Sequence, residues 1–219
     1  MIVTVGHTKG GVGKSTLALN IAIERLRAGV DTLLIDGDPK QGSIGKAIEI
    51  RAAAGLAPIV PCVLLDDASA LRRRIDALKE HYRDIVIDVG GKDSNALRAA
   101  LLVTDILLLP IAPESVEIWA IDDILAIVEE ARAIRDVRVF AVLNRAKSHG
   151  KDNRDTLAAI RDYSEITLLD VAIGARSVYG SAFGLGRSVA EYRPLNKKAA
   201  AELAMLMAEI FDRFQERTS

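Results

Sequence analysis

The eight residues from Lys9 to Thr16 constrain the fold of this chain more than any other stretch. They lie between a short β-branched run, Ile2 to Val5, and a segment of helical character from Ser15 to Arg27. Glycines here let backbone N–H groups turn toward an anion, a lysine brings positive charge to terminal phosphates, and a serine hydroxyl can bind Mg²⁺. The stretch therefore predicts a strand, a phosphate-binding loop and a helix, the loop being Lys9, Gly10, Gly11, Val12, Gly13, Lys14, Ser15 and Thr16.

This loop departs from the usual phosphate-loop pattern at one position. The pattern has a glycine five places before Gly13, whereas this chain has Thr8 there and opens the loop with a second lysine, Lys9. Because Lys14 already supplies the usual cation, Lys9 is an additional candidate phosphate ligand.

Composition limits the other possibilities. Of the 219 residues 50% are hydrophobic and 27% charged, so the chain can bury a full core and is expected to form one domain over residues 1–219. The formal net charge of −1 means that nucleic acid or anionic lipid would need a local basic patch. Cys62 is the only cysteine and the three histidines are scattered, so no internal disulfide forms and no metal cluster is indicated. No signal peptide or apolar run of membrane-spanning length is present, which predicts a cytoplasmic protein without a membrane partner.

Apolar runs that alternate with helical segments predict the fold class. Runs that end on polar residues are typical of parallel strands covered on both faces. Their spacing predicts an α/β fold, a mostly parallel twisted sheet with helices on both faces. The expected strands are 2–5, 32–35, a short strand before Leu65, 85–88, 106–109, 137–143 and one within 166–173, and the segment from Pro110 to Pro113 is expected to be a loop.

Acidic residues follow two of the expected strands. Asp36 and Asp38 end the second strand, and Asp88 ends the strand from Ile85. Parallel strands end at one edge of a sheet, so these carboxylates are expected to meet the phosphate loop. Ser15 could then bind Mg²⁺ directly, Asp36 and Asp88 through water, while Asp38 orients an attacking water. Plain turns at Asp-Gly and Asp-Pro, and a solvated strand end at Asp88, are the alternatives.

These motifs together resemble the ParA/MinD family of deviant Walker A ATPases, which have a P-loop NTPase fold. The loop from Lys9 to Thr16 is similar to that family's Walker A loop. Asp36-Gly37-Asp38-Pro39 with Gln41 resembles its switch I, and Asp88 with the glycines after it resembles Walker B and switch II. The resemblance spans the chain, and it is greatest to the small ParA-type partition ATPases without an N-terminal helix-turn-helix domain.

Two departures from the family pattern concern the switches. Lys40 separates Pro39 from Gln41, which are usually adjacent in the family. Gly90 and Gly91 follow Asp88 where many members have prolines, so the geometry of switch II is an open question.

The resemblance implies ATP and Mg²⁺ as cofactors. Lys9 is expected to reach the phosphates of ATP bound by a partner subunit, so that ATP joins a homodimer and hydrolysis releases it. Together with Lys14 and Asp38, Lys9 would form the catalytic set of a slow, partner-stimulated ATPase. Asn144, at the end of the strand from Val137, is expected to bind adenine, although a plain strand-terminal asparagine is the alternative.

Basic residues suggest a nucleic-acid surface. Between Arg176 and Lys198 they are accompanied by a single acid, Glu191, and pairing of two subunits would double their number. We expect nonspecific DNA binding by this stretch, although solvated side chains are the alternative. The candidates are Arg176, Arg187, Arg193, Lys197 and Lys198, with a second basic stretch at Arg145, Lys147, Lys151 and Arg154.

The character of the last helix bears on whether the chain resembles membrane-anchored members of the family. Its apolar stripe could be a membrane anchor, yet from Lys197 onward four basic residues balance four acids, which favours packing against the sheet. The stripe consists of Leu203, Leu206, Met207, Ile210, Phe211 and Phe214.

The leading hypothesis is a nucleoid-associated ParA-like ATPase that moves plasmid or chromosome DNA with a ParB-like or small centromere-binding adaptor. One alternative is a relative that positions a protein cargo on the nucleoid. An alternative from another class is a metabolite kinase or ligase of the dethiobiotin-synthetase type, which would need a substrate pocket. The sequence does not separate DNA from protein cargo.

Overall fold

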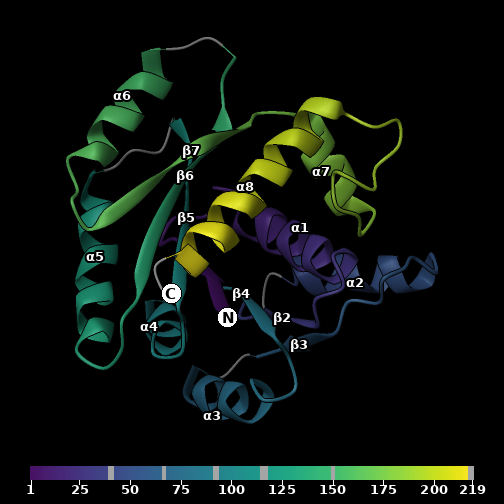
Figure 1. The fold of residues 1–219 in the computed structure, drawn as a ribbon, viewed down its shortest axis with the longest axis horizontal. Helices are drawn as coiled ribbons and strands as arrows, with labels where there is room; N and C mark the ends of the chain where they lie inside the picture. Colours follow the sequence, from purple (N-terminus) through teal and green to yellow (C-terminus); the bar gives the residue numbers. More distant parts are fainter. Residues whose placement is uncertain (39–41, 66–67, 91–93, 114–117, 149–150, 217–219) are drawn as a thin grey trace.

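The computed structural model describes residues 1–38, 42–65, 68–90, 94–113, 118–148 and 151–216 (Figure 1). The side chains of residues 68–70, 94, 118–119 and 213–216 are not described. The predictions on Pro39, Lys40, Gln41 and Gly91, and the Phe214 side chain, therefore lie outside the described residues.

One parallel sheet organises the described chain and confirms the predicted fold class. Its strands lie in the order β3-β2-β4-β1-β5-β6-β7, and every neighbouring pair is parallel. The strands are β1 (Ile2–Val5), β2 (Thr32–Asp36), β3 (Cys62–Leu64), β4 (Asp84–Asp88), β5 (Ile106–Ile111), β6 (Arg138–Ala146) and β7 (Ile166–Gly174).

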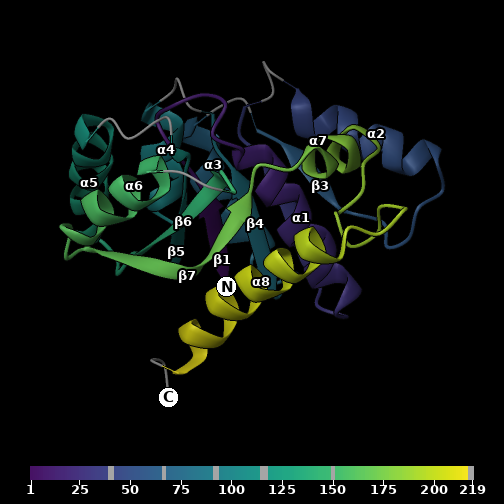
Figure 2. The same ribbon diagram turned by 90° about the horizontal axis from the view of Figure 1, so that it is seen from above.

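Helices cover both faces of this sheet. Side chains alternate along a strand, so Val3 and Val5 pack on one face while Ile2 packs on the other. Figure 2 shows α1 and α8 on one side of the sheet and α3, α4 and α5 on the opposite side. The first face carries α1 (Lys14–Arg27), α2 (Ser43–Ala53), α7 (Ser177–Gly184) and α8 (Lys197–Glu216), and the second carries α3 (Ala68–Leu78), α4 (Ser94–Leu101), α5 (Ile118–Arg132) and α6 (Lys151–Arg161).

Three details differ from the predicted elements. Pro110 and Ile111 extend β5 instead of opening a loop. The β1–β5 pairing reaches only to Leu108, so Pro110 has a strand neighbour on one side, where a residue without N–H is tolerated. In addition, β6 continues to Ala146, and α7 was not expected because Gly180 and Gly184 obscure its helical pattern.

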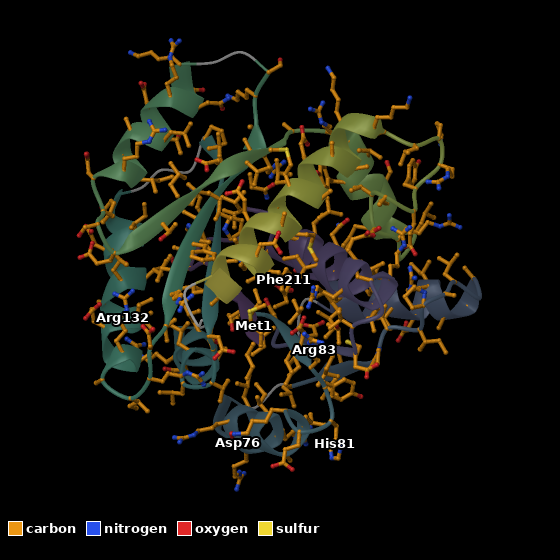
Figure 3. The ribbon with its side chains drawn as sticks, in the orientation of Figure 1. Met1, Asp76, His81, Arg83, Arg132 and Phe211 are labelled. Carbon is orange, nitrogen blue, oxygen red and sulfur yellow. The ribbon has the colours of Figure 1, made fainter. Side chains whose placement is uncertain are left out.

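The final helix packs on the sheet, as its charge balance predicted. Leu203, Leu206 and Ile210 are fully buried, and the guanidinium carbon of Arg25 lies 4.0 Å from the centroid of the Phe211 ring. Figure 3 labels Phe211 on this helix. Glu209 on the same helix accepts hydrogen bonds from two backbone N–H groups of the edge strand β7, at 2.8 Å each. Such contacts protect a sheet edge from pairing with another chain. Among the described helices none is long and apolar enough to cross a membrane.

Candidate functional site

The C-terminal ends of the central strands bring the predicted residues together. Val5 lies opposite Asp88 in the β1–β4 pairing, and Asp36 lies opposite Asp88 in the β2–β4 pairing. Gly37 N–H donates to the Asp88 carbonyl at 2.8 Å, and a Cβ on Gly37 would lie only 2.9 Å from that oxygen. The two acidic strand ends are thus in direct contact beside the loop that follows β1.

The loop has the backbone of a phosphate cradle. Gly11 and Gly13 have φ angles of 79° and 94°, a left-handed conformation that glycine adopts without strain. A Cβ on Gly13 would lie 2.3 Å from the Asn144 amide nitrogen, so a side chain there would displace Asn144. Lys14 begins α1, is buried, and donates from Nζ to the Lys9 carbonyl at 2.8 Å.

His7 lies just before this loop and is hydrogen-bonded to it, a contact that the sequence did not indicate. Its side chain is 3% exposed, and Nδ1 accepts a hydrogen bond from Lys9 N–H at 2.9 Å. Burial, with the nearby charges of Lys14 and Lys9, lowers the pKa of His7 to about 4. The imidazole is therefore neutral at physiological pH and can keep accepting the hydrogen bond.

A cleft of about 270 Å³ lies between the loop and the acids. Lys14, Ser15, Asp36, Asp38 and Asp88 all line it, so the structure brings together the residues predicted separately along the chain. Lys9 is not among the described residues that line this cleft.

Asp88 carries the clearest electrostatic signal in the cleft. Burial raises its pKa to about 7, although a hydrogen bond from Ser15 and the charge of Lys14 oppose that shift. Its Oδ1 is buried and has no hydrogen-bond partner. Burial likewise lowers the pKa of Lys14, opposed by the charges of Asp88 and Asp38. A carboxylate with an unsatisfied buried oxygen is costly without a cation.

These residues fit Mg²⁺. Asp88 offers an unpaired oxygen, Ser15 a hydroxyl, and burial raises the pKa of Asp36 even though Asp38 N–H and Gly45 N–H donate to its carboxylate. No group of three or more His, Cys, Asp or Glu side chains in the described ranges is arranged to hold a metal alone. Mg²⁺ commonly takes one or two protein oxygens and completes its shell with water and phosphate, which is the arrangement predicted here.

The Asp38 side chain lies directly against Gly90, two residues after Asp88. A Cβ on Gly90 would lie 2.5 Å from Asp38 Oδ2 and 2.7 Å from its Cγ. Glycine at this position therefore leaves the space that the Asp38 side chain occupies.

A second cleft of about 410 Å³ adjoins the phosphate loop on its other side. Gly13, Thr16, Asn144 and Tyr179 are among its lining residues. Asn144 is 5% exposed, and its amide donates to the Val12 carbonyl at 2.6 Å. The predicted contact of Asn144 with adenine stays a prediction, while its hydrogen bond to the loop is part of the structure.

The predicted DNA-binding residues fall into two groups. Arg176 forms an ion pair with Glu202 of α8, which already engages its guanidinium. Arg193, Lys197 and Lys198 are exposed, and Arg187 is half-buried. Glu191, the single acid of this stretch, pairs with the buried Arg51 of α2 at 2.8 Å.

The sequence matches a known protein family over most of its length. The sequence profile described as the CobQ/CobB/MinD/ParA nucleotide binding domain matches residues 3–178. The chain belongs to this family. The resemblance to ParA/MinD proteins and the P-loop fold are thereby confirmed.

Proteins similar to this chain have names that state different cellular processes. The chain is 25% identical over 211 residues to the maintenance of carboxysome distribution protein A of Halothiobacillus neapolitanus, covering 94% of each chain. It is 26% identical over 211 residues to the protein ParA of Rhizobium radiobacter, covering 92% of this chain and 90% of that one. Its fold is similar to the septum site-determining protein MinD of Pyrococcus horikoshii complexed with Mg-ADP, with a TM-score of 0.75, 21% identity and coverage of 96% and 95%.

Proposed function

We propose that this chain is an ATP-hydrolysing switch that dimerises on binding ATP, binds nonspecific DNA as a dimer and transports a cargo over the nucleoid. The observation that carries the proposal is the cleft in which Lys14, Ser15, Asp36, Asp38 and Asp88 converge beside a left-handed glycine loop. Membership of a nucleotide-binding family and the Mg-ADP complex of a structural neighbour support ATP and Mg²⁺ as its ligands.

Each residue of the cleft has a role that its position supports. ATP with Mg²⁺ supplies the phosphoryl group that water attacks and neutralises part of its charge. Ser15 would hold the ion directly, and Asp36 and Asp88 would hold it through water. Lys14 would move from the Lys9 carbonyl to the terminal phosphates, and Asp38 would orient the attacking water.

Lys9 distinguishes a dimerising switch from an ordinary phosphate-loop ATPase. It opens the loop but does not line the cleft of its own chain, as expected if its ammonium group serves the partner's nucleotide. The γ-phosphate would then favour the dimer through contacts that hydrolysis removes.

The start of α8 supports a phosphate-binding surface. Asn196 Oδ1 accepts Ala199 N–H at 3.1 Å and caps the helix, so Lys197 and Lys198 occupy its first turn. Lysines are unfavourable at a helix N-terminus, whose partial charge is positive, unless an anion is nearby. Because Arg51 neutralises Glu191, no acid of this stretch offsets the exposed lysines and Arg193.

The cargo has two candidates. The ParA relative supports plasmid or chromosome DNA with a ParB-like or small centromere-binding adaptor. The carboxysome distribution relative supports a protein assembly as cargo, carried by the same ATP cycle. Pull-down with tagged chain in ATP, compared with ADP, separates the two by recovering either a DNA-binding adaptor or an assembly component.

Sizing of the protein with ATP and with ADP tests the switch. Asp38→Ala is expected to form a persistent dimer in ATP, and Lys9→Ala is expected to stay monomeric while still binding ATP. Lys14→Ala is expected to lose ATP hydrolysis, which is measured separately as a rate. Lys79→Ala, which removes a lysine from an exposed ion pair with Asp76, is the control and should behave as the unmodified chain. A Lys9→Ala protein that dimerises normally would refute the role of Lys9.

DNA binding is tested by charge reversal. Arg187→Glu with Lys197→Glu should weaken ATP-dependent DNA binding and reduce its salt dependence. Arg161→Glu with Lys79→Glu reverses two positive charges on other parts of the surface and is the matched control. Equal DNA affinity in all three proteins would refute this surface.

A further inference from the structure

Arg145 has an uncommon backbone conformation for a residue within a strand. It is the one non-glycine residue in the described ranges with a positive φ, 58°. It lies in β6 where the pairing with β7 changes register between Asn144 and Ala146. A long side chain in this conformation is strained, and such strain persists where the surrounding structure requires it.

The irregular backbone lets two consecutive side chains reach one loop. In a regular strand Asn144 and Arg145 would point to opposite faces of the sheet. Here Asn144 Nδ2 donates to the Val12 carbonyl at 2.6 Å, and Arg145 donates to the Gly11 carbonyl at 2.8 Å. Both donors come from more than 130 residues away in sequence, at separations of 132 and 134.

Holding these carbonyls determines where the loop's N–H groups point. In a planar trans peptide the C=O and the following N–H point in opposite directions. Fixing the carbonyls of Gly11 and Val12 outward therefore directs the N–H groups of Val12 and Gly13 the other way. Before nucleotide binds, Lys14 Nζ on the Lys9 carbonyl orients a third peptide of the same loop.

We propose that Arg145 is a positioning residue for the nucleotide site: its strained backbone in β6 places the guanidinium on Gly11 and preorganises the phosphate-binding N–H groups. This inference rests on the proposed function, because it requires that the loop bind a nucleoside diphosphate or triphosphate. It gives Arg145 a role other than the DNA contact suggested by its basic neighbours in sequence.

Three variants of Arg145 separate positioning from folding. Arg145→Ala and Arg145→Gly both remove the donor, but only glycine adopts the φ of 58° without strain. Arg145→Lys keeps a donor of similar reach. Arg161→Ala, an exposed arginine at the end of α6, is the control for loss of one positive charge.

The measurements are ADP affinity by calorimetry and thermal unfolding without nucleotide. We expect ADP to bind about threefold to tenfold more weakly to the alanine and glycine variants, the size of one lost hydrogen bond. Arg145→Lys should recover part of the affinity, and Arg145→Gly should unfold at or above the temperature of the unmodified chain.

Two results would overturn the inference. One is unchanged ADP affinity in Arg145→Ala. The other is a loss of ADP affinity that Arg145→Gly restores together with thermal stability, since relief of backbone strain would then explain both. Failure of the unmodified chain to bind ADP or ATP would instead refute the proposed function, so the two failures are distinguishable.

Discussion

Gly90→Ala should disable hydrolysis while sparing nucleotide binding. The new Cβ would lie 2.5 Å from Asp38 Oδ2, 2.7 Å from Cγ and 2.9 Å from Cβ. Rotation of the carboxylate cannot relieve this overlap because the whole side chain is too close. To regain an ordinary contact of about 3.4 Å, Asp38 must move by nearly 1 Å. Misplacing a catalytic group by that distance costs about 100-fold in rate.

Single-turnover hydrolysis with protein in excess over ATP measures this rate even when turnover is slow. We expect a decrease of about 100-fold in Gly90→Ala, with ATP affinity within about twofold, because the P-loop residues, including Lys14, are not displaced. Gly184→Ala is the matched control, since a Cβ there meets nothing within 4 Å. Hydrolysis at the normal rate in Gly90→Ala, with Asp38→Ala inactive, would refute the steric argument.

Three further predictions concern charge. The pKa of His7 falls from 6.5 to about 4 on folding, so the free energy of unfolding should decrease by about 3 kcal/mol as the pH falls from 6.5 to 4. His7→Asn should remove this decrease in urea unfolding, and an unchanged pH profile would contradict the prediction. The pKa of Asp88 rises from 3.8 to about 7 on folding, so this carboxyl lowers stability progressively as the pH rises from about 4 to 7, and the loss is complete above pH 7. Asp88→Asn should therefore be more stable than the unmodified chain at pH 8, and it should lose any strengthening of ADP binding by Mg²⁺, measured by thermal shift. Arg51→Ala leaves Glu191 without its buried partner and should cost about 3–5 kcal/mol, whereas replacing both with Met should cost less; equal losses would show that the ion pair is unimportant.

Much of the site follows from local sequence. A glycine-rich loop between an apolar run and a helix, and acids that end apolar runs, are patterns of a few residues, and parallel strands bring such ends to one edge. The positions of Lys14, Asp36 and Asp88 were predictable for this reason. The role proposed for Lys9 comes from the family resemblance, because neither its spacing nor its charge indicates that role alone.

Other parts of the site depend on contacts between distant residues. His7 looked like an ordinary histidine, because its burial and its bond to Lys9 arise only once the loop folds. The sequence alone gave no physical reason for glycine at position 90. The structure supplies one, because the Asp38 side chain occupies the space that a Cβ at this position would need.

The sequence by itself determined the alternation of strands and helices, the phosphate loop and the acidic strand ends, since each is encoded by neighbours along the chain. Tertiary structure alone decided that Arg145 leaves a regular strand to hold Gly11, and that Arg51 is buried against Glu191. The partners in these two contacts are 134 and 140 residues apart, and no local pattern specifies a contact made only when distant elements pack together.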